Sequence, residues 1–486
     1  MATPIPENRA RTTTRTATEA VGGALRRGQR ESDRVHLGIT SDSRAVKPGN
    51  VFVALRGESF DGHTFVEQAL KRGATLFVVQ RGQAWRIAGA DVIEVEDTLV
   101  AWGDLARSHL RRWRSESGGA RRVVAITGSA GKTTTKEITA ALLGIAGAVH
   151  RTAGNLNNLI GVPAVAFGVE SPHRFAVLEV GMSVPGEIDA LAAVSEPDVA
   201  VITNIGLAHT EGVVGGRAAV AREKGDLFEG LRESGVAIVN LDDELVRSES
   251  RRSRGSRVVT FGRHADATYR LADRTPLGLR GSHVVIEGAG PNTRREVTLP
   301  LIGEAAALDL VAALAAAEAA AGTVFEARAI EAALAKLALP GGRGSLRVLR
   351  DGTILYDDTY NANPESMRAA LGSLREIASA EGRRAVAVLG EMKELGGEAE
   401  AEHAAMGDAL VLSKIDIAIG CGGLIDLALD RAAAGGIAVH KTTSVEAAVK
   451  LAVGLVRAGD VVLIKGSRSV GTELVADAIA EKGDRL

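Results

Sequence analysis

Cysteine, aromatic side chains and long hydrophobic runs are all scarce in this sequence. One cysteine, Cys421, among 486 residues excludes an intramolecular disulfide framework and a metal site built from several cysteines. Aromatic residues make up 3% of the chain, which argues against binding of single-stranded nucleic acid by base stacking. No apolar run reaches the ~18 residues that a membrane-spanning helix needs, so we expect no such helix.

An excess of charge of either sign is also missing. The 58 Lys and Arg residues nearly balance the 60 Asp and Glu residues, and the net charge is −2. Binding of a polyanion through bulk charge is therefore disfavoured, although a local basic site stays open. With 45% hydrophobic and 24% charged residues, the composition is typical of a folded globular protein. The length exceeds what one hydrophobic core supports and indicates about three domains.

The first 34 residues differ from the rest of the chain. They are rich in Arg and Thr, they contain Glu7, Glu19 and Glu31, and they lack the apolar stretch of a secretory signal. We therefore expect a mobile extension at residues 1–34 and a protein that stays in the cytoplasm.

Short apolar runs rich in β-forming residues recur along the chain, many of them separated by segments with helical periodicity. Strands that alternate with helices indicate βαβ units, and continuous apolar strands are typical of sheets covered by helices on both faces. We expect an α/β protein with largely parallel sheets. The expected strands are Val51–Leu55, Leu76–Val79, Val92–Val95, Val123–Thr127, Ala176–Val180, Val199–Asn204, Val236–Leu241, Val258–Phe261, Ile354–Asp357, Ala385–Leu389, Asp416–Gly420 and Val461–Ile464. The clearest expected helices are Lys132–Leu143, Ala305–Ala321, Glu365–Ala378 and Val445–Leu455.

Two stretches of the sequence suggest domain boundaries. Arg111–Arg122 is charged and contains Ser and Gly, and Pro340–Gly344 follows a long alanine-rich helix. We therefore expect a small first domain at residues 35–112, a central α/β domain at 113–340 and a C-terminal α/β domain at 341–486.

A glycine-rich turn connects the expected strand Val123–Thr127 to the helix that follows. Such a turn aims backbone N–H groups at an anion, and the helix dipole favours negative charge at the same point. Gly-Lys-Thr in this context favours a nucleoside triphosphate site over an ordinary turn, because Lys132 can reach the β- and γ-phosphates and Thr133 can ligate Mg²⁺. The usual phosphate-loop pattern has its first glycine where Ile126 stands in this chain. No guanine-reading N-K-x-D motif follows, so the sequence does not identify the base of the nucleotide. The residues expected around the phosphates are Gly128, Ser129, Ala130, Gly131, Lys132, Thr133 and Thr134.

Three further polar residues follow strands of the same expected sheet. Glu179 ends the strand Ala176–Val180, His209 follows the next strand, and Lys224 lies on an expected helix beyond it. Open parallel sheets bind ligands beyond the carboxyl ends of their strands, so Glu179 is placed to bind a hard cation. Taken alone, each residue also has a simpler interpretation: a solvated carboxylate, a structural histidine and part of a charged helix face.

Several stretches of the sequence resemble the Mur ligases, whose phosphate loop also lacks the first glycine. The stretch Asp357–Pro364 resembles the members that add D-alanyl-D-alanine, whereas sister ligases usually carry a histidine there. The resemblance covers roughly residues 35–475. It rests on Asp42–Arg44, Asp61–His63, Thr127–Thr133, Gly154–Asn158, Gly161–Pro163, Glu179–Glu187, Thr203–His209, Asp357–Pro364, Gly390–Gly396 and Lys465–Arg468.

The resemblance implies the three-domain architecture of this family. A small N-terminal α/β domain would bind a UDP-linked substrate, a central domain with a phosphate loop on a parallel sheet would bind ATP, and a C-terminal Rossmann-like domain would complete the ligase. The implied reaction is ATP-dependent amide formation in peptidoglycan precursor synthesis. UDP-N-acetylmuramoyl-tripeptide is joined to D-alanyl-D-alanine through an acyl phosphate, with release of ADP and phosphate. Mg²⁺ at two positions and a carbamylated lysine are the implied cofactors. We expect a monomer with no nucleic-acid partner and no insertion into membranes.

Residue roles follow from the same resemblance, position by position. Arg343 resembles an arginine that reaches the γ-phosphate, and Asp358 resembles an acid that contacts the ribose of ATP. The implied catalytic residues are Lys132, His209, Lys224 and Arg343. The implied metal ligands are Thr133, Glu179, His209 and Lys224 as its carbamate. The implied substrate contacts are Ser43, Arg44, Asn157, Asn158, Tyr360, Asn361 and Asn363, the last of which, before Pro364, also has the form of a helix start.

One segment departs from the family pattern. Mur ligases usually have His-Asn and then Asn after the position of Gly303, whereas this chain has Ala305, Ala306 and Asp309 there, so those nucleotide contacts do not transfer. A nucleotide-dependent switch and a sister ligase that adds a free amino acid are the alternative functions. The third residue of the tripeptide, meso-diaminopimelate or L-lysine, and the base that deprotonates the amine stay open.

Overall fold

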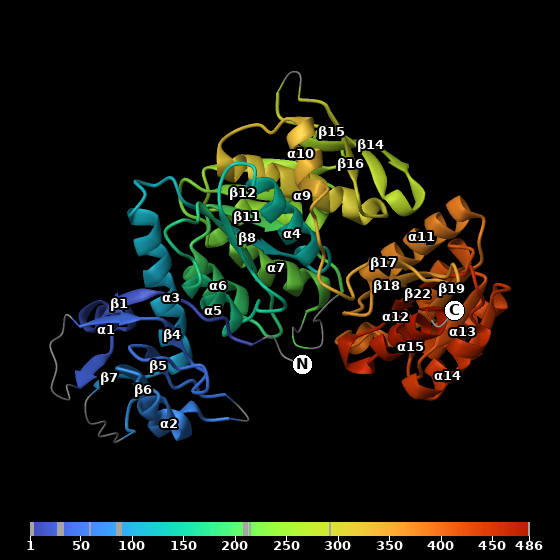
Figure 1. Cartoon of the computed structure of the whole chain (residues 1–486). Helices are drawn as coiled ribbons and strands as arrows, with labels where there is room; N and C mark the ends of the chain where they lie inside the picture. Colours follow the sequence, from blue (N-terminus) through green and yellow to red (C-terminus); the bar gives the residue numbers. More distant parts are fainter. Residues whose placement is uncertain are drawn as a thin grey trace.

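Three bodies of α/β structure follow one another along the chain, from blue to red in Figure 1. The structure, a computed structural model, describes residues 4–26, 34–57, 60–83, 90–207, 212, 215–290 and 293–484. Every strand expected from the sequence is present, with ends that differ by at most two residues, and the sheets are largely parallel as predicted. Among the described residues, none of the helices combines the length and the apolar character that crossing a bilayer requires.

The first body is built on a five-stranded sheet in the order β2-β7-β6-β5-β4, with strands β4 to β7 parallel and β2 antiparallel at one edge. A separate pair, β1 and β3, is antiparallel. The elements are β1 (Arg11–Thr13), α1 (Thr14–Val21), β2 (Ala24–Arg26), β3 (Val35–Leu37), β4 (Ile39–Thr40), β5 (Val51–Val53), the short 3₁₀ helix η1 (Gly62–Phe65), α2 (Val66–Lys71), β6 (Leu76–Gln80), β7 (Asp91–Val95) and α3 (Thr98–Ser115).

The expectation of a mobile extension at residues 1–34 is wrong for residues 10–26, which are part of this first body. Strand β2 pairs with β7, and Thr14 at the start of α1 donates a hydrogen bond to Asp91 at 2.8 Å. The same hydroxyl lies 2.9 Å from Nε2 of His36, and all three side chains are buried. A polar residue of this segment, Thr14, thus binds buried polar partners, so polar composition alone did not distinguish the segment from a mobile tail.

Helix α3 fixes the first body to the second. The indole N–H of Trp102 donates to the carbonyl of Ile160 at 3.0 Å, and that of Trp113 donates to the carbonyl of Glu170 at 3.1 Å. Both tryptophans are buried, so the helix shares its core with the central body.

The central body contains a nine-stranded sheet in the order β16-β15-β14-β13-β12-β11-β8-β10-β9. Helices α5, α6 and α7 cover one face of its parallel part, and α4, α9 and α10 cover the other. The strands are β8 (Arg122–Thr127), β9 (Val149–Arg151), β10 (Phe175–Glu179), β11 (Val199–Ile202), β12 (Val236–Asn240), β13 (Arg257–Gly262), β14 (Tyr269–Pro276), β15 (Ser282–Glu287) and β16 (Arg295–Leu299). The helices are α4 (Lys132–Leu143), α5 (Gly161–Phe167), α6 (Glu187–Ser195), α7 (Gly216–Glu229), α8 (Glu244–Glu249), α9 (Glu304–Ala321) and α10 (Ala327–Leu334).

Strands β14, β15 and β16 were not predicted from the sequence. They form an antiparallel extension of the parallel sheet. Along β16 buried and exposed residues alternate, so the apolar run that marks the parallel strands is missing.

The C-terminal body contains a six-stranded sheet in the order β17-β18-β22-β19-β20-β21, parallel except for β17 at one edge. Helices α11, α12 and α13 pack on one face, and α14 and α15 pack on the other. The elements are β17 (Ser345–Val348), β18 (Ile354–Asp357), α11 (Pro364–Glu381), β19 (Ala385–Leu389), α12 (Ala399–Leu412), β20 (Ile417–Gly420), α13 (Ile425–Ala434), β21 (Ala438–Lys441), α14 (Val445–Leu455), β22 (Val461–Lys465) and α15 (Glu473–Asp484).

Polar contacts from α11 hold the C-terminal body against the central one. Arg274 of β14 and Glu376 of α11 form a largely buried ion pair of 2.5 Å. Near the start of the same helix, Glu365 accepts a hydrogen bond from the backbone N–H of Leu207 at 3.3 Å. The carboxyl edge of the central sheet therefore faces the beginning of α11.

Candidate active site

The phosphate loop, residues 128–135, runs from the end of β8 into the first turn of α4, at the carboxyl edge of the central sheet. Its first residue must be glycine, because a Cβ at Gly128 would lie 1.9 Å from a threonine hydroxyl oxygen. Asn204 holds the loop: its carbonyl oxygen accepts the N–H of Ser129 at 3.0 Å, and its side-chain oxygen accepts the N–H of Ala130 at 2.9 Å. The turn is therefore held in place by the neighbouring strand, as a preformed anion cradle requires.

Lys132 begins helix α4, and its side chain folds back over the loop. Its ammonium group donates to the carbonyl of Gly128 at 2.7 Å. Burial lowers the pKa of Lys132, the negative charge of Glu179 raises it, and the positive charge of Arg343 lowers it further. Residues from the central and C-terminal bodies thus act on one ammonium group.

Thr133 and Glu179, both predicted metal ligands, lie together at the end of β10. The Thr133 hydroxyl donates to Oε2 of Glu179 at 2.8 Å, and the side-chain amide of Asn157 donates to Oε1 at 3.0 Å. Glu179 is 1% exposed, so its interpretation as a solvated carboxylate is wrong. Asn157, for which a substrate contact is predicted, therefore orients this carboxylate. No group of three or more His, Cys, Asp or Glu within the described ranges is arranged to hold a metal ion.

Lys224 lies on the inner face of α7. It is 1% exposed, so its interpretation as part of a charged, exposed helix face is wrong. Burial and the nearby charge of Lys132 lower the pKa of Lys224 well below its usual range. Its acidic neighbours are engaged elsewhere, since Glu223 accepts from the N–H of Gly186 and Asp226 pairs with an arginine. His209, predicted to act at this point, lies outside the described residues.

Three asparagines expected to contact substrate have side chains bonded within the protein. The side-chain oxygen of Asn158, which precedes α5, accepts the N–H of Gly161 at 2.8 Å, and that of Asn361 accepts the N–H of the next residue. Asn363 caps α11 as its sequence context predicts, and its amide donates to the carbonyl of Ser129 at 3.0 Å. That last bond ties the C-terminal body directly to the phosphate loop.

Arg343 lies in the segment that leads from the central body into β17. Its guanidinium carbon is 3.7 Å from the centre of the Tyr360 ring, which is a close cation–π contact. The N–H of Tyr360 in turn donates to the carbonyl of Gly342 at 2.9 Å. The buried Nε of Arg343 has no hydrogen-bond partner in the described part of the chain. The arginine is therefore oriented by Tyr360.

Asp358 is paired with a lysine to which the sequence analysis gave no role. Lys465, at the end of β22, is 2% exposed and lies 2.5 Å from Asp358. The same ammonium group donates to the carbonyl of Asn361 at 2.9 Å. The sequence did contain a signal for this pair, because Lys465 ends the otherwise apolar strand β22.

Ser43 and Arg44 lie in the first body, in the segment between β4 and β5. The Ser43 hydroxyl is buried and donates to Gln68 at 2.7 Å. Arg44 binds Asp42 through two hydrogen bonds of 2.9 Å, and these bonds lower the pKa of Asp42. The arginine side chain is 81% exposed and therefore accessible to a ligand.

Asp309, the position that departs from the family, lies beneath the phosphate loop. Its carboxyl group accepts from the hydroxyl of Thr135 at 3.1 Å. A Cβ at Gly131 would lie 2.3 Å from the same oxygen, and the φ of +81° there also favours glycine. Burial raises the pKa of Asp309 to about 8, and the bond from Thr135 offsets only part of that rise. Since an aspartate elsewhere ionises near pH 4, Asp309 binds more protons in the folded state than in the unfolded one between these values.

We expect Asp309→Asn to stabilise the protein increasingly as pH rises. Wild-type stability is lost as the pH climbs from about 4 toward about 8, because the folded state must then release the proton of Asp309. The difference between variant and wild type should grow by at most about 1.4 kcal/mol per pH unit and level off above pH 8. Urea unfolding at pH 5 to 9 measures it. Glu304→Gln, at the exposed start of the same helix, is the control and should give a nearly constant difference.

Comparisons with known proteins agree with this geometry. Three models match the chain: the Mur ligase family catalytic domain at residues 35–110, the Mur ligase middle domain at 126–317 and the Mur ligase glutamate ligase domain at 342–468. The UDP-N-acetylmuramoyl-tripeptide–D-alanyl-D-alanine ligase of Escherichia coli is 36% identical over 447 residues, which is 92% of this chain and 94% of that protein. The ligase of the same name from Bacillus subtilis is 36% identical over 406 residues, 83% of this chain and 84% of that protein.

Solved structures give the same result. MurF from Acinetobacter baumannii superposes with a TM-score of 0.85 at 29% identity and covers 97% of this chain and 99% of that one. MurF ligase from Thermotoga maritima in complex with ADP has a TM-score of 0.76 at 28% identity, over 91% and 97% of the two chains. With the phosphate loop, the buried Glu179 and Arg343 gathered at one point, the chain belongs to the Mur ligase family.

Proposed function

We propose that this protein is the ATP-dependent ligase that joins D-alanyl-D-alanine to UDP-N-acetylmuramoyl-tripeptide in peptidoglycan precursor synthesis. The main support for this proposal is that the central and C-terminal bodies are in contact at the phosphate loop. Asn363 of the C-terminal body bonds to Ser129 of the loop, and Arg343 acts on Lys132. Relatives that are 36% identical to this chain over 406 and 447 residues carry this activity in their names.

Amide formation from a carboxylate needs the carboxylate to be activated first. A carboxylate oxygen of the tripeptide attacks the γ-phosphorus of ATP, the bond to the β–γ bridging oxygen breaks, and an acyl phosphate and ADP result. The amine of D-alanyl-D-alanine then attacks the acyl carbon, and phosphate leaves as the amine gives up its proton. Phosphoryl transfer depends mainly on positioning and on charge neutralisation. Lys132 and Arg343, whose charge acts on Lys132, would supply positive charge to the transferring group.

The residues present fit a magnesium ion beside the nucleotide. Mg²⁺ prefers oxygen ligands and is commonly held by one or two carboxylates together with substrate phosphates. The Thr133 hydroxyl and the Glu179 carboxylate are such oxygens, they lie 2.8 Å apart, and they face the same loop. These two residues would hold the ion, which when bound supplies positive charge to the phosphate oxygens.

Lys224 fits the carbamate that the family resemblance implies. Burial and the charge of Lys132 lower the pKa of Lys224, which favours the neutral amine, and the neutral amine is the form that reacts with CO₂. At this depth, and beside the positive charge of Lys132, an unmodified lysine cation is costly. A carbamate would place negative charge near Lys132 and offer an oxygen donor for a second Mg²⁺, together with Glu179 and His209.

The three bodies would divide the work between them. We assign the UDP end of the acceptor to residues 35–112, ATP to 113–340 and the dipeptide to 341–486. Arg44, with its exposed guanidinium, can pair with the diphosphate of the acceptor. Closure of the bodies would keep water away from the acyl phosphate.

An ADP-release assay that crosses UDP-linked acceptors with candidate amines tests the function. Turnover should require UDP-N-acetylmuramoyl-tripeptide together with D-alanyl-D-alanine. Turnover with free amino acids in place of the dipeptide would instead identify a sister ligase, and a lack of turnover with every amine would favour a nucleotide-dependent switch. Acceptors that end in meso-diaminopimelate and in L-lysine, run side by side, identify the third residue.

Lys132→Ala should lower kcat by on the order of 10²–10³, because it removes a positive charge aimed at the transferring phosphoryl group. The same ADP-release assay measures the loss. Lys336→Ala, an exposed lysine of the same body, is the control and should leave the rate unchanged. A rate for Lys132→Ala within a few-fold of wild type would contradict the assignment of the phosphate loop.

Arg44→Ala should raise the KM for the UDP-linked tripeptide about tenfold, the worth of one hydrogen bond to a charged group. The KM for ATP should not change, because ATP binds to another body. Initial rates with each substrate varied in turn separate the two constants. Arg26→Ala removes a similarly exposed arginine, paired with Glu94, from the same body and should change neither constant. Equal effects on both KM values would argue against a UDP site here.

Lys224→Ala should lose most of the activity and recover part of it in buffer that contains a short carboxylic acid such as acetate. The acid supplies the carboxylate that the carbamate would provide. Bicarbonate should stimulate wild-type enzyme prepared free of CO₂ and have no effect on the variant. Lys132→Ala treated with the same acid is the control and should not recover. Full activity of Lys224→Ala without added acid would remove this lysine from the site.

A further inference from the structure

Lys136 is completely buried on α4, one helical turn beyond Lys132. Its ammonium group lies among three oxygen-bearing groups. It lies 2.8 Å from Glu137, donates to the carbonyl of Thr152 at 2.8 Å, and forms a longer ion pair of 3.8 Å with Glu179. The Glu179 contact is therefore an attraction between charges and not a hydrogen bond. Such complete enclosure of an ionisable side chain is costly unless its partners are well placed.

The contacts of Lys136 belong to a line of alternating charges that runs from the surface to the phosphate loop. Arg151 of β9 binds Glu137 at 2.7 Å, Glu137 binds Lys136, and Lys136 faces Glu179, which accepts from the Thr133 hydroxyl. The two carboxylates and the two cations balance one another. The line therefore neutralises Glu179 without contacting the nucleotide.

Thr152 connects the two inner members of this line. Its carbonyl accepts from Lys136, and its hydroxyl accepts from the backbone N–H of Glu179 at 2.9 Å. A displacement of the Lys136 side chain would therefore change the position of Glu179 in two ways. It would alter the ion pair between them, and it would move Thr152, which bonds to both residues.

We propose that Lys136 is a positioning residue that holds the Glu179 carboxylate in place for the metal ion, and that Glu137 and Arg151 support it from the protein surface. The proposal rests on the proposed function, in which Glu179 binds Mg²⁺. Groups that orient a metal ligand from behind commonly change metal affinity or activity 10–100-fold when they are removed.

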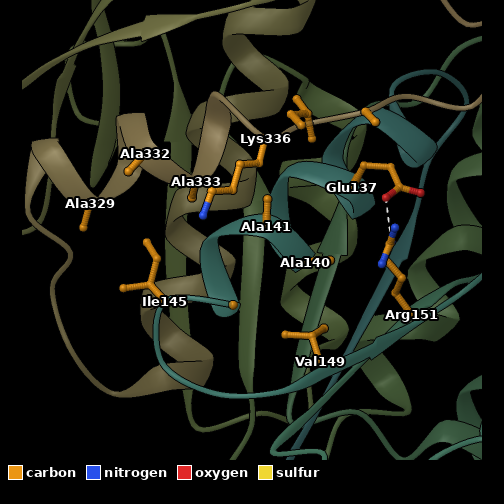
Figure 2. Close-up of a pocket in the computed structure, with 13 residues that line it drawn as sticks. Glu137, Ala140, Ala141, Ile145, Val149, Arg151, Ala329, Ala332, Ala333 and Lys336 are labelled. Carbon is orange, nitrogen blue, oxygen red and sulfur yellow. Dashed lines mark hydrogen bonds and ion pairs between the residues drawn. The ribbon is translucent and has the colours of Figure 1, made fainter.

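The outer end of the line is accessible in a pocket of about 540 Å³ between α4, β9 and α10. Figure 2 shows the Glu137–Arg151 pair on one wall of this pocket and Lys336 on another. The Arg151 side chain is 51% exposed, so it can be replaced without opening the core. Lys336 is an exposed lysine that lines the same pocket, and in the described part of the chain it forms no ion pair with Glu137 or Arg151.

The test measures the Kd of Mn²⁺ for the full-length protein by electron paramagnetic resonance, with a non-hydrolysable ATP analogue present. Lys136→Met should weaken Mn²⁺ binding at least tenfold. Arg151→Ala should weaken Mn²⁺ binding about two- to fivefold, because it removes one half-exposed ion pair. Lys336→Met should leave the Kd unchanged. In the ADP-release assay the apparent Mg²⁺ requirement of Lys136→Met should rise while the KM for the UDP-linked tripeptide stays constant.

Glu179→Gln separates this inference from the function on which it rests. If Glu179→Gln leaves the Mn²⁺ Kd unchanged, the metal assignment itself is wrong. If Glu179→Gln weakens binding but Lys136→Met binds Mn²⁺ as wild type does, or more tightly, the positioning role is overturned. Should Lys136→Met fail to fold, as thermal unfolding would reveal, Arg151→Ala decides: an unchanged Kd overturns the proposal, and the weaker binding stated above supports it.

Discussion

The site depends on keeping one carboxylate charged and oriented inside the protein. Glu179 is 1% exposed, and an ionised group at that depth is tolerated only with partners of good geometry. The partners come from different parts of the chain: Thr133 from the phosphate loop, Asn157 from the loop before α5 and Lys136 from α4. Because these contacts meet at Glu179, the loop, the helix and the end of β10 form one rigid unit.

The same reasoning applies to the basic groups around the loop. Burial and a nearby positive charge lower the pKa values of both Lys132 and Lys224, and that charge is Arg343 for Lys132 and Lys132 for Lys224. The positive charges of Lys132 and Arg343 suit the loop to a polyanionic substrate such as ATP. The protein thus stores positive charge at the point where phosphoryl transfer develops negative charge.

The C-terminal body completes the site through contacts that no single domain contains. Asn363 caps its own helix and also bonds to the phosphate loop, so the start of α11 and the loop are positioned together. The Arg274–Glu376 pair fixes the same helix farther along. Through Tyr360, the C-terminal body also orients the arginine that approaches Lys132. Such contacts fix the position of the C-terminal body against the phosphate loop, as a reaction that depends on precise positioning requires.

Local pattern in the sequence was sufficient for most of the parallel strands, the phosphate loop, the start of α11 at Asn363 and the place of Glu179 at a strand end. These features depend on short-range rules: apolar runs, glycine-rich turns and helix caps. The short parallel strands β4, β9 and β21 were not predicted. Tertiary structure alone decided that residues 10–26 join the first body, because Thr14 finds buried partners far away in the chain. It also decided that Lys224 is buried, that Lys465 pairs with Asp358 and that Lys136 stands behind Glu179. A charged residue looks alike in sequence whether it faces water or the interior, and only the packing of distant segments determines which environment it meets.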